Sequence, residues 1–300
     1  MNKGGWALVV LLCLMAAPWH GHQVWAADKP PLRVVASFSI LGDMVKQVGG
    51  DAVAVTVLVG PDSDAHGYQP TPEDAKAVAA ADIIAINGLG LEGWIGRIIE
   101  ASGSKARLLV ASAGVKLRVM EHDGKVAYDP HAWQDLRNGR LYVRNIAGAL
   151  MAAVPEQAEA IRKRATAYDA ELKAMDKSIR EQFESISEER RKIVTSHDAF
   201  GYFGEAYGVT FLAPLGMNDE AAAASDVAAL IRQIKDEGIK TVFLENMTNP
   251  RLIRQIAEDS GATVGGTLYS DSLSDADGSA PSYLDMFKNN VPKFKAAMDR

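Results

Sequence analysis

Residues 155 to 189 read PEQAEAIRKRATAYDAELKAMDKSIREQFESISEE and decide the fold. Apolar side chains recur every three or four residues along this segment, which is the spacing of one face of an α-helix. These apolar positions are Ala158, Ile161, Ala165, Tyr168, Leu172, Met175, Ile179, Phe183 and Ile186. A continuous helix of about 35 residues would extend about 50 Å, long enough to run the height of two packed lobes. We expect a long connecting helix over 154–190; a projecting coiled-coil arm is the alternative.

Short apolar runs alternate with helical patterns on both sides of this segment, which is the order of α/β units built on mainly parallel sheets. Before it, the pattern predicts strands over 33–38, 52–59, 82–87 and 106–111 and helices over 41–48 and 72–80. After it, the pattern predicts strands over 192–196, 210–214, 241–245 and 262–268 and helices over 225–237, 250–260 and 283–298. We therefore predict an α/β fold of two similar lobes, over 27–153 and 191–300, each with a mainly parallel sheet flanked by helices.

Two of the expected helices carry capping signals at their first turn. Thr71 stands before Pro72, with Glu73 and Asp74 following, so its side chain can cap the helix over 72–80. Ser225 precedes an acidic residue and an apolar stripe, which predicts a similar cap for the helix over 225–237.

The first 26 residues have the pattern of a secretory signal peptide. Lys3 supplies a basic start, residues 6–17 form an apolar run, and Val24–Ala26 is a plausible cleavage site. The apolar run is shorter than the roughly 20 residues that cross a bilayer. Cys13, the sole cysteine, follows Leu12, where a lipoprotein signal would carry a small residue. We therefore expect an exported, periplasmic protein without a lipid anchor or thiolate chemistry.

Composition excludes several classes of protein. With 48% hydrophobic and 23% charged residues, the chain can bury a core, so a disordered or collagen-like chain is excluded. A formal net charge of −6 has the wrong sign for gathering phosphates, so we expect no nucleic-acid partner.

Three titratable side chains follow expected strands, namely His66, His197 and Asp271. The carboxyl ends of strands in open α/β sheets converge on the crevice where ligands bind. His131 stands in a turn fixed by Pro130, just before another apparent helix. These residues are far apart in the sequence and form no short chelating motif. Spacing alone therefore leaves two interpretations open, a shared metal site and separate structural histidines.

Five segments of the sequence, taken together and in order, form a pattern specific enough to indicate a protein family. They are His66–Asp74, Asn87–Trp94, Asp129–Trp133, Ser196–Phe200 and Tyr269–Leu273. This set resembles the metal-binding solute receptors of ABC importers for zinc and manganese, often grouped as TroA-like proteins. The resemblance covers essentially the whole mature chain, including the long helix.

The resemblance implies a rigid, two-lobed, monomeric receptor that holds one divalent metal ion between its lobes and delivers it to an ABC permease in the membrane. By matching position, His66 and His131 would be ligands from the first lobe, and His197 and Asp271 from the second. A protein of this kind is not an enzyme. Relatives of the fold have also been regarded as adhesins, but no segment of this sequence indicates an adhesive surface.

The ligand set implied by the resemblance favours zinc. Three imidazoles and one carboxylate suit zinc, whereas manganese prefers more oxygen ligands. Manganese receptors of the family often have glutamate where this chain has His197. Manganese and iron are the alternatives, and the short stretch over 120–128, with only His122, lacks the long histidine-rich loop of many zinc receptors. We interpret His122 as an ordinary loop residue.

Several neighbours of the implied ligands are candidates for orienting them. Asp129, Asp198 and Glu245 can hydrogen-bond the second nitrogen of an imidazole or serve as local caps. Trp94 and Trp133 are expected to pack the wall of the crevice. Because the imidazoles must be neutral to bind metal, affinity is expected to weaken as the pH falls through about 6.5.

A secreted zinc hydrolase is the remote alternative. Three histidines can hold zinc and leave a fourth position for an activated water molecule. Asp271 argues against this interpretation because its carboxylate would occupy that fourth position.

Overall fold

The computed structural model describes residue 1 and residues 30–122, 125–216 and 223–299. The chain divides into two units, Met1–Pro30 and Pro31–Arg300, and every helix and strand of the described residues belongs to the second unit. The expected signal peptide and its cleavage site at Val24–Ala26 lie outside the described residues.

The first lobe contains a four-stranded parallel sheet in the order β2-β1-β3-β4. Its strands are β1 (Leu32–Phe38), β2 (Val53–Val59), β3 (Ile83–Ile86) and β4 (Arg107–Val110). Its helices are α1 (Ser39–Gly49), α2 (Pro72–Ala80), α3 (Ile95–Ser102) and α4 (Leu136–Ala153). The last five residues of β1 are all buried, as expected of a central parallel strand covered on both faces.

The second lobe repeats this topology. Its sheet has the order β10-β9-β7-β8 and is also parallel throughout. Its strands are β7 (Lys192–Val194), β8 (Thr210–Leu212), β9 (Thr241–Glu245) and β10 (Thr263–Leu268). Its helices are α6 (Gly201–Tyr207), α7 (Ala224–Asp236), α8 (Arg251–Ser260) and α9 (Tyr283–Met298). In both lobes the first strand lies between the second and the third, so the prediction of two similar parallel-sheet lobes is confirmed.

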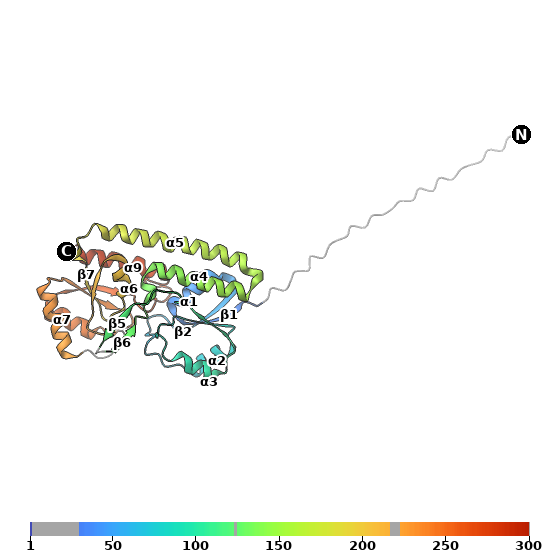
Figure 1. Cartoon of the computed structure of the whole chain (residues 1–300), viewed down its shortest axis with the longest axis horizontal. Coiled ribbons are helices and arrows are strands. Elements are labelled where there is room, and N and C mark those ends of the chain that lie inside the picture. The colour runs from blue at the N-terminus through green and yellow to red at the C-terminus, as the bar shows by residue number, and fades with distance from the viewer. Residues whose placement is uncertain (2–29, 123–124, 217–222, 300) are drawn as a thin grey trace. The chain divides into compact units, whose positions relative to one another are not determined.

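One long helix, α5 (Ala158–Glu184), connects the lobes and contacts helices of both (Figure 1). It packs against α1 and α4 of the first lobe and against α6 and α9 of the second. Its 27 residues extend about 40 Å, so it is shorter than the 154–190 predicted from the apolar pattern. Short 3₁₀ turns, Pro155–Gln157 and Glu188–Arg190, occupy the two ends of the predicted range.

Two arginines attach α5 to the lobes. The Arg164 guanidinium donates to the carbonyls of Val48 and Gly49, at the end of α1. The Arg180 guanidinium donates to the carbonyl of Ala206 in α6. Each arginine satisfies carbonyl groups at or near the end of a helix, where intrahelical partners are lacking. The helix is therefore part of the body of the protein, and the alternative of a projecting arm is wrong.

The apolar core is continuous between the lobes. A single cluster of buried side chains includes β1 and α1, passes along α4 and α5, and reaches α6 and α9. A smaller cluster lies between α7, α8 and the second sheet. Because the large cluster belongs to both lobes, relative movement of the lobes would disturb close-packed side chains.

Some local features differ from the prediction. A hairpin, β5 (Val119–His122) and β6 (Lys125–Tyr128), lies before His131, in a stretch with no predicted element. The cap at Thr71 is confirmed, with Asp74 completing a capping box. The predicted cap at Ser225 is wrong, because α7 begins one residue earlier and the Ser225 hydroxyl donates to Asp226 instead.

No helix among the described residues has the length and apolarity needed to span a membrane.

The packing of α4 against α9 leads to a stability prediction. A Cβ added at Gly139 would lie 2.5 Å from the hydroxyl oxygen of the buried Tyr283. Gly139→Ala is therefore expected to lower the free energy of unfolding by about 1–3 kcal/mol, because the ring has no free space to shift into. Urea unfolding followed by circular dichroism measures this change.

Gly148→Ala is the matched control on the same helix, because nothing lies within 4 Å of an added Cβ. Alanine favours helix over glycine by about 1 kcal/mol, so this variant is expected to be more stable than the wild type. Equal stability of the two variants would contradict the described packing of α4 on Tyr283.

Candidate metal centre

Four side chains predicted from the sequence converge on one point between the two sheets. His66 follows β2, His131 follows the hairpin, His197 follows β7, and Asp271 follows β10. Each offers one nitrogen or oxygen atom, and these four atoms all lie within 4.8 Å of one another. Strands of a parallel sheet direct their carboxyl ends to one edge, so the loops from both lobes meet here.

The distances between these atoms are those of ligands around a small ion. His66 Nε2 lies 3.2 Å from His131 Nε2 and 3.1 Å from Asp271 Oδ2. His197 Nε2 also lies 3.1 Å from Asp271 Oδ2, and His131 Nε2 lies 3.6 Å from it. A tetrahedron with bonds of about 2.0 Å has edges of about 3.3 Å. Four of the six separations are therefore close to tetrahedral edges, and all six lie within 4.8 Å.

Two carboxylates determine which nitrogen of each ring faces inward. Asp129 Oδ1 lies 2.8 Å from His131 Nδ1, and Glu245 Oε2 lies 2.8 Å from His197 Nδ1. A proton on each Nδ1 leaves a lone pair on each Nε2 when the ring is neutral. These lone pairs point at the Asp271 carboxylate, so hydrogen-bond acceptors on the rings face an acceptor oxygen on Asp271. The arrangement requires positive charge between them, either protons or a metal cation.

The site is buried, which makes its charges interact strongly. His131, His197 and Asp271 are 1% exposed or less, and the His66 side chain is 8% exposed. Burial alone would raise the pKa of Asp271, but the charges of His131 and His197 hold it well below its usual range. Burial alone would lower the pKa of His131, but Asp271 and Asp129 raise it to about 9. The metal-free site therefore carries protons at neutral pH.

The loop that carries Asp271 is hydrogen-bonded to the first lobe. The carbonyl oxygen of Ser270 accepts from Trp133 Nε1 at 2.8 Å and from Gln134 Nε2 at 2.7 Å. The backbone N–H of Leu273 donates to the Ser39 hydroxyl at 2.9 Å. These bonds do not involve the four converging atoms, so the Asp271 loop is held against the first lobe without them.

The segment Asn87–Trp94 positions the two histidines of the first lobe. The Asn87 amide donates to the carbonyl of Pro130 at 2.9 Å and accepts from the Tyr142 hydroxyl. The Trp94 ring N–H donates to the carbonyl of Ala65 at 2.9 Å, one residue before His66. The motif Asn87–Trp94 therefore supports the motifs His66–Asp74 and Asp129–Trp133, which carry the two histidines.

The remaining sequence candidates have different outcomes. Asp129 and Glu245 lie against imidazoles, whereas among the described residues Asp198 makes no hydrogen bond to one. Trp94 and Trp133 are buried, as expected of packing residues. The His122 side chain lies outside the described part of the structure.

Sequence reasoning assigned no role to three residues that support the site, Ser270, Arg118 and Glu92. The Glu92 carboxylate accepts from the backbone N–H groups of Asn87 and Gly88. Glu92 and Ser270 lie inside the recognised motifs, so the motifs gave a signal for them. Arg118 lies outside every motif.

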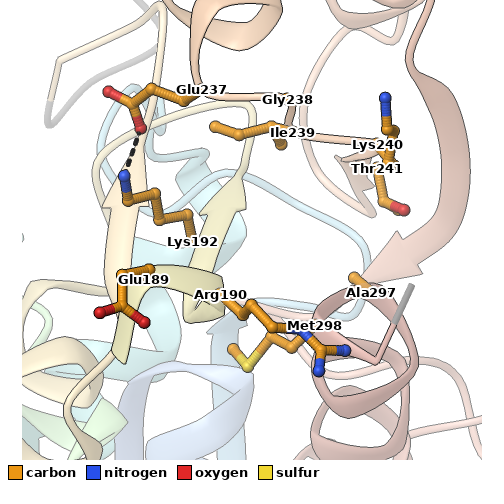
Figure 2. Close-up of a pocket in the computed structure, with 10 residues that line it drawn as sticks. All are labelled: Glu189, Arg190, Lys192, Glu237, Gly238, Ile239, Lys240, Thr241, Ala297 and Met298. Carbon is orange, nitrogen blue, oxygen red and sulfur yellow. Dashed lines mark ion pairs between the residues drawn. The ribbon is translucent and has the colours of Figure 1, made fainter. Parts of the chain in front are cut away.

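A separate pocket lies at the other end of the second sheet and holds none of these residues (Figure 2). Lys192 and Thr241, the first residues of β7 and β9, line it. The Lys192–Glu237 ion pair, 2.8 Å long, spans part of it. The pocket is therefore at the amino ends of the strands, away from the edge at which ligands of such sheets bind.

The chain is similar to known metal receptors over nearly its whole length. The family model described as "Zinc-uptake complex component A periplasmic" (ZnuA) matches residues 34–297. The manganese-binding lipoprotein MntA of Halalkalibacterium halodurans is 32% identical over 98% of this chain and 97% of the relative. The iron ABC transporter substrate-binding lipoprotein MtsA of Streptococcus pyogenes serotype M1 is 32% identical, covering 97% of this chain and 96% of its own.

The structure of the periplasmic zinc binding protein TroA from Treponema pallidum is also similar. It aligns with a TM-score of 0.85 at 27% identity, covering 90% of this chain and 100% of the other.

The protonated histidines lead to a prediction for the metal-free protein. Because the folded pKa of His131 is raised to about 9, its stabilising contribution is fully present below its unfolded pKa of 6.5 and is lost as the pH rises through 9. The free energy of unfolding is expected to fall over this window by on the order of 3 kcal/mol. Urea unfolding of chelator-treated protein between pH 6 and 10 measures the decline.

His131→Gln is the control, because it removes the titrating ring and should flatten this part of the profile. A wild-type stability that rose between pH 6.5 and 9 would contradict the charge arrangement. The raised pKa of His131 also moves the window in which protons compete with metal above the 6.5 expected from the sequence.

Proposed function

The chain belongs to the ZnuA family of metal-binding substrate receptors of ABC importers, and from this we propose that it carries zinc, held by His66, His131, His197 and Asp271. As a member of the family it is an extracytoplasmic receptor that works with a membrane permease, and it is not an enzyme. The observation that supports the ligand assignment is the convergence of four acceptor atoms on a buried point. A cation among them would neutralise Asp271 and accept every inward lone pair.

The donor set supports zinc as the cargo. Zinc takes imidazole nitrogen and carboxylate oxygen in tetrahedral sites, and four of the six separations between the proposed ligand atoms are close to tetrahedral edges. A mixed nitrogen and oxygen site also binds zinc more tightly than manganese in the general order of divalent affinities. The fourth position is taken by Asp271, which leaves no place for the water molecule that a zinc hydrolase would activate.

Manganese is the second candidate, and one atom of the site favours it. Asp271 Oδ1 is buried and has no hydrogen-bond partner among the described residues. A carboxylate that used both oxygens would give five ligands with more oxygen character, as manganese prefers. Two relatives are named for manganese and iron, so the cargo has to be settled by direct competition.

We propose the following organisation around this site. Residues 1–26 are an export signal, 27–153 and 191–300 are the two lobes that each supply two ligands, and 154–190 connect them. The connection contains α5, whose arginine contacts hold both lobes. Small rearrangements of the ligand loops, rather than wide opening of the lobes, then accompany metal exchange.

Replacing each ligand tests the assignment. His66→Ala, His131→Ala, His197→Ala and Asp271→Ala are each expected to weaken zinc binding by at least about a hundredfold, because each removes one of four bonds to the metal. Isothermal titration calorimetry with a competing chelator measures the affinity. Zinc at a hundredfold excess over Kd should stabilise the wild type by about 2.7 kcal/mol and these variants less.

His122→Ala is the matched control, since it removes a histidine outside the proposed set and should leave the affinity unchanged. Wild-type affinity in two of the four ligand variants would be incompatible with the assignment.

Competition between metals tests the cargo. Metal-free protein dialysed against equal concentrations of zinc and manganese is expected to retain one zinc ion per chain, because nitrogen-rich sites favour zinc. Elemental analysis measures both metals, and starting from the manganese-loaded protein checks that equilibrium has been reached. Retention of mostly manganese in both experiments would make manganese the cargo.

A further inference from the structure

Asp129, which orients the His131 ring, is itself fixed by a residue outside every recognised motif. One carboxylate oxygen, Oδ1, accepts from His131 Nδ1 at 2.8 Å and from the His131 backbone N–H at 2.9 Å. The other oxygen, Oδ2, accepts from Arg118 Nη1 at 2.9 Å. Asp129 is fully buried, so Arg118 supplies the cation that a buried carboxylate needs.

Arg118 belongs to the first lobe but is held by helix α6 of the second. Its Nε donates to Glu205 at 2.9 Å, and its backbone N–H donates to the Tyr202 hydroxyl at 3.0 Å. The same hydroxyl donates to the carbonyl of Lys116 at 3.2 Å. Both Glu205 and Tyr202 lie on α6, so the chain just before the hairpin is bound to this helix at three points.

The guanidinium reaches Asp129 because α6 begins with a glycine. A Cβ at Gly201 would overlap Nη1 and the central carbon of the Arg118 guanidinium. The backbone of Gly201 has a conformation that alanine also adopts, so the glycine is needed for space. The start of α6 therefore provides the surface on which the guanidinium lies between Asp129 and Glu205.

We propose that Arg118 is a positioning residue for the metal site, acting through Asp129 on His131 and linking that ligand to α6 of the second lobe. This inference rests on the proposed function, in which His131 binds the metal. Arginine suits the role because its planar fork donates to two carboxylates at once from fixed directions. With Asp129 held on both oxygens, the His131 ring keeps Nε2 pointed at Asp271. Loss of the Arg118 contacts frees the carboxylate to turn, and the ligand turns with it.

The experiment measures zinc affinity and the rate of zinc transfer to a chelator in the full mature chain. Arg118→Ala is expected to weaken zinc binding about 10- to 100-fold, the usual effect of removing a group behind a ligand. Arg118→Lys keeps the charge but reaches only one carboxylate, so an intermediate loss is expected. Wild-type affinity and transfer rate in Arg118→Ala would overturn the inference.

A double-mutant cycle separates positioning from a general structural role. Asp129→Ala removes the group through which Arg118 acts, so adding Arg118→Ala to it is expected to cause little further loss of affinity. Fully additive losses would overturn the inference, because Arg118 would then act by another route.

Gly201→Ala perturbs the contact without changing any charge and serves if Arg118→Ala does not fold. It is expected to speed zinc transfer severalfold, whereas Gly148→Ala on α4 leaves the rate unchanged. Equal rates in these two glycine variants would overturn the inference. A wild-type chain that bound neither zinc nor manganese would overturn the proposed function itself, which distinguishes the two failures.

Discussion

The structure depends on one buried charge, the carboxylate of Asp271. It lies fully buried, and three imidazole nitrogens face its Oδ2 atom at 3.1 to 3.6 Å. A carboxylate in this environment is unstable without positive charge beside it. Protons on the histidines supply that charge in the metal-free protein, and a divalent cation would supply it in the loaded protein. At the proposed site, metal binding would therefore be an exchange of cations at a preformed anionic centre.

The rest of the fold places the groups around this charge. Two sheets of equal topology bring three strand ends to one place beside the end of the β5–β6 hairpin, and the continuous core prevents the lobes from separating freely. Asp129 and Glu245 fix the rings from behind, so the inward nitrogen of each is determined before any metal arrives. The same carboxylates increase the basicity of the rings, which would strengthen their bonds to a metal ion and also makes the rings hold protons more tightly.

Much of this arrangement could be predicted from the sequence. Buried parallel strands are continuous apolar runs, and this pattern predicts β9 to the residue. The helical patterns predict α2 and α9 to the residue as well. The four converging side chains were recognised from ordered motifs, because their spacing alone carried no chelating pattern. The hairpin, α3 and α6 were missed, since all three are short and α6 contains two glycines that disfavour an isolated helix. Its helical form depends on burying Tyr202 and Phe203 in the core, which a local pattern does not reveal. The role of Arg118 follows from that packing and had no signal of its own.

The two hydrogen bonds that end on the Ser270 carbonyl have a consequence for loading of the proposed site. They fasten the loop of Asp271 to the first lobe without any contribution from the four converging atoms, so loading would require little ordering of the chain. The free energy of binding would then come from the bonds to the ion, with little of it spent on arranging the polypeptide around it.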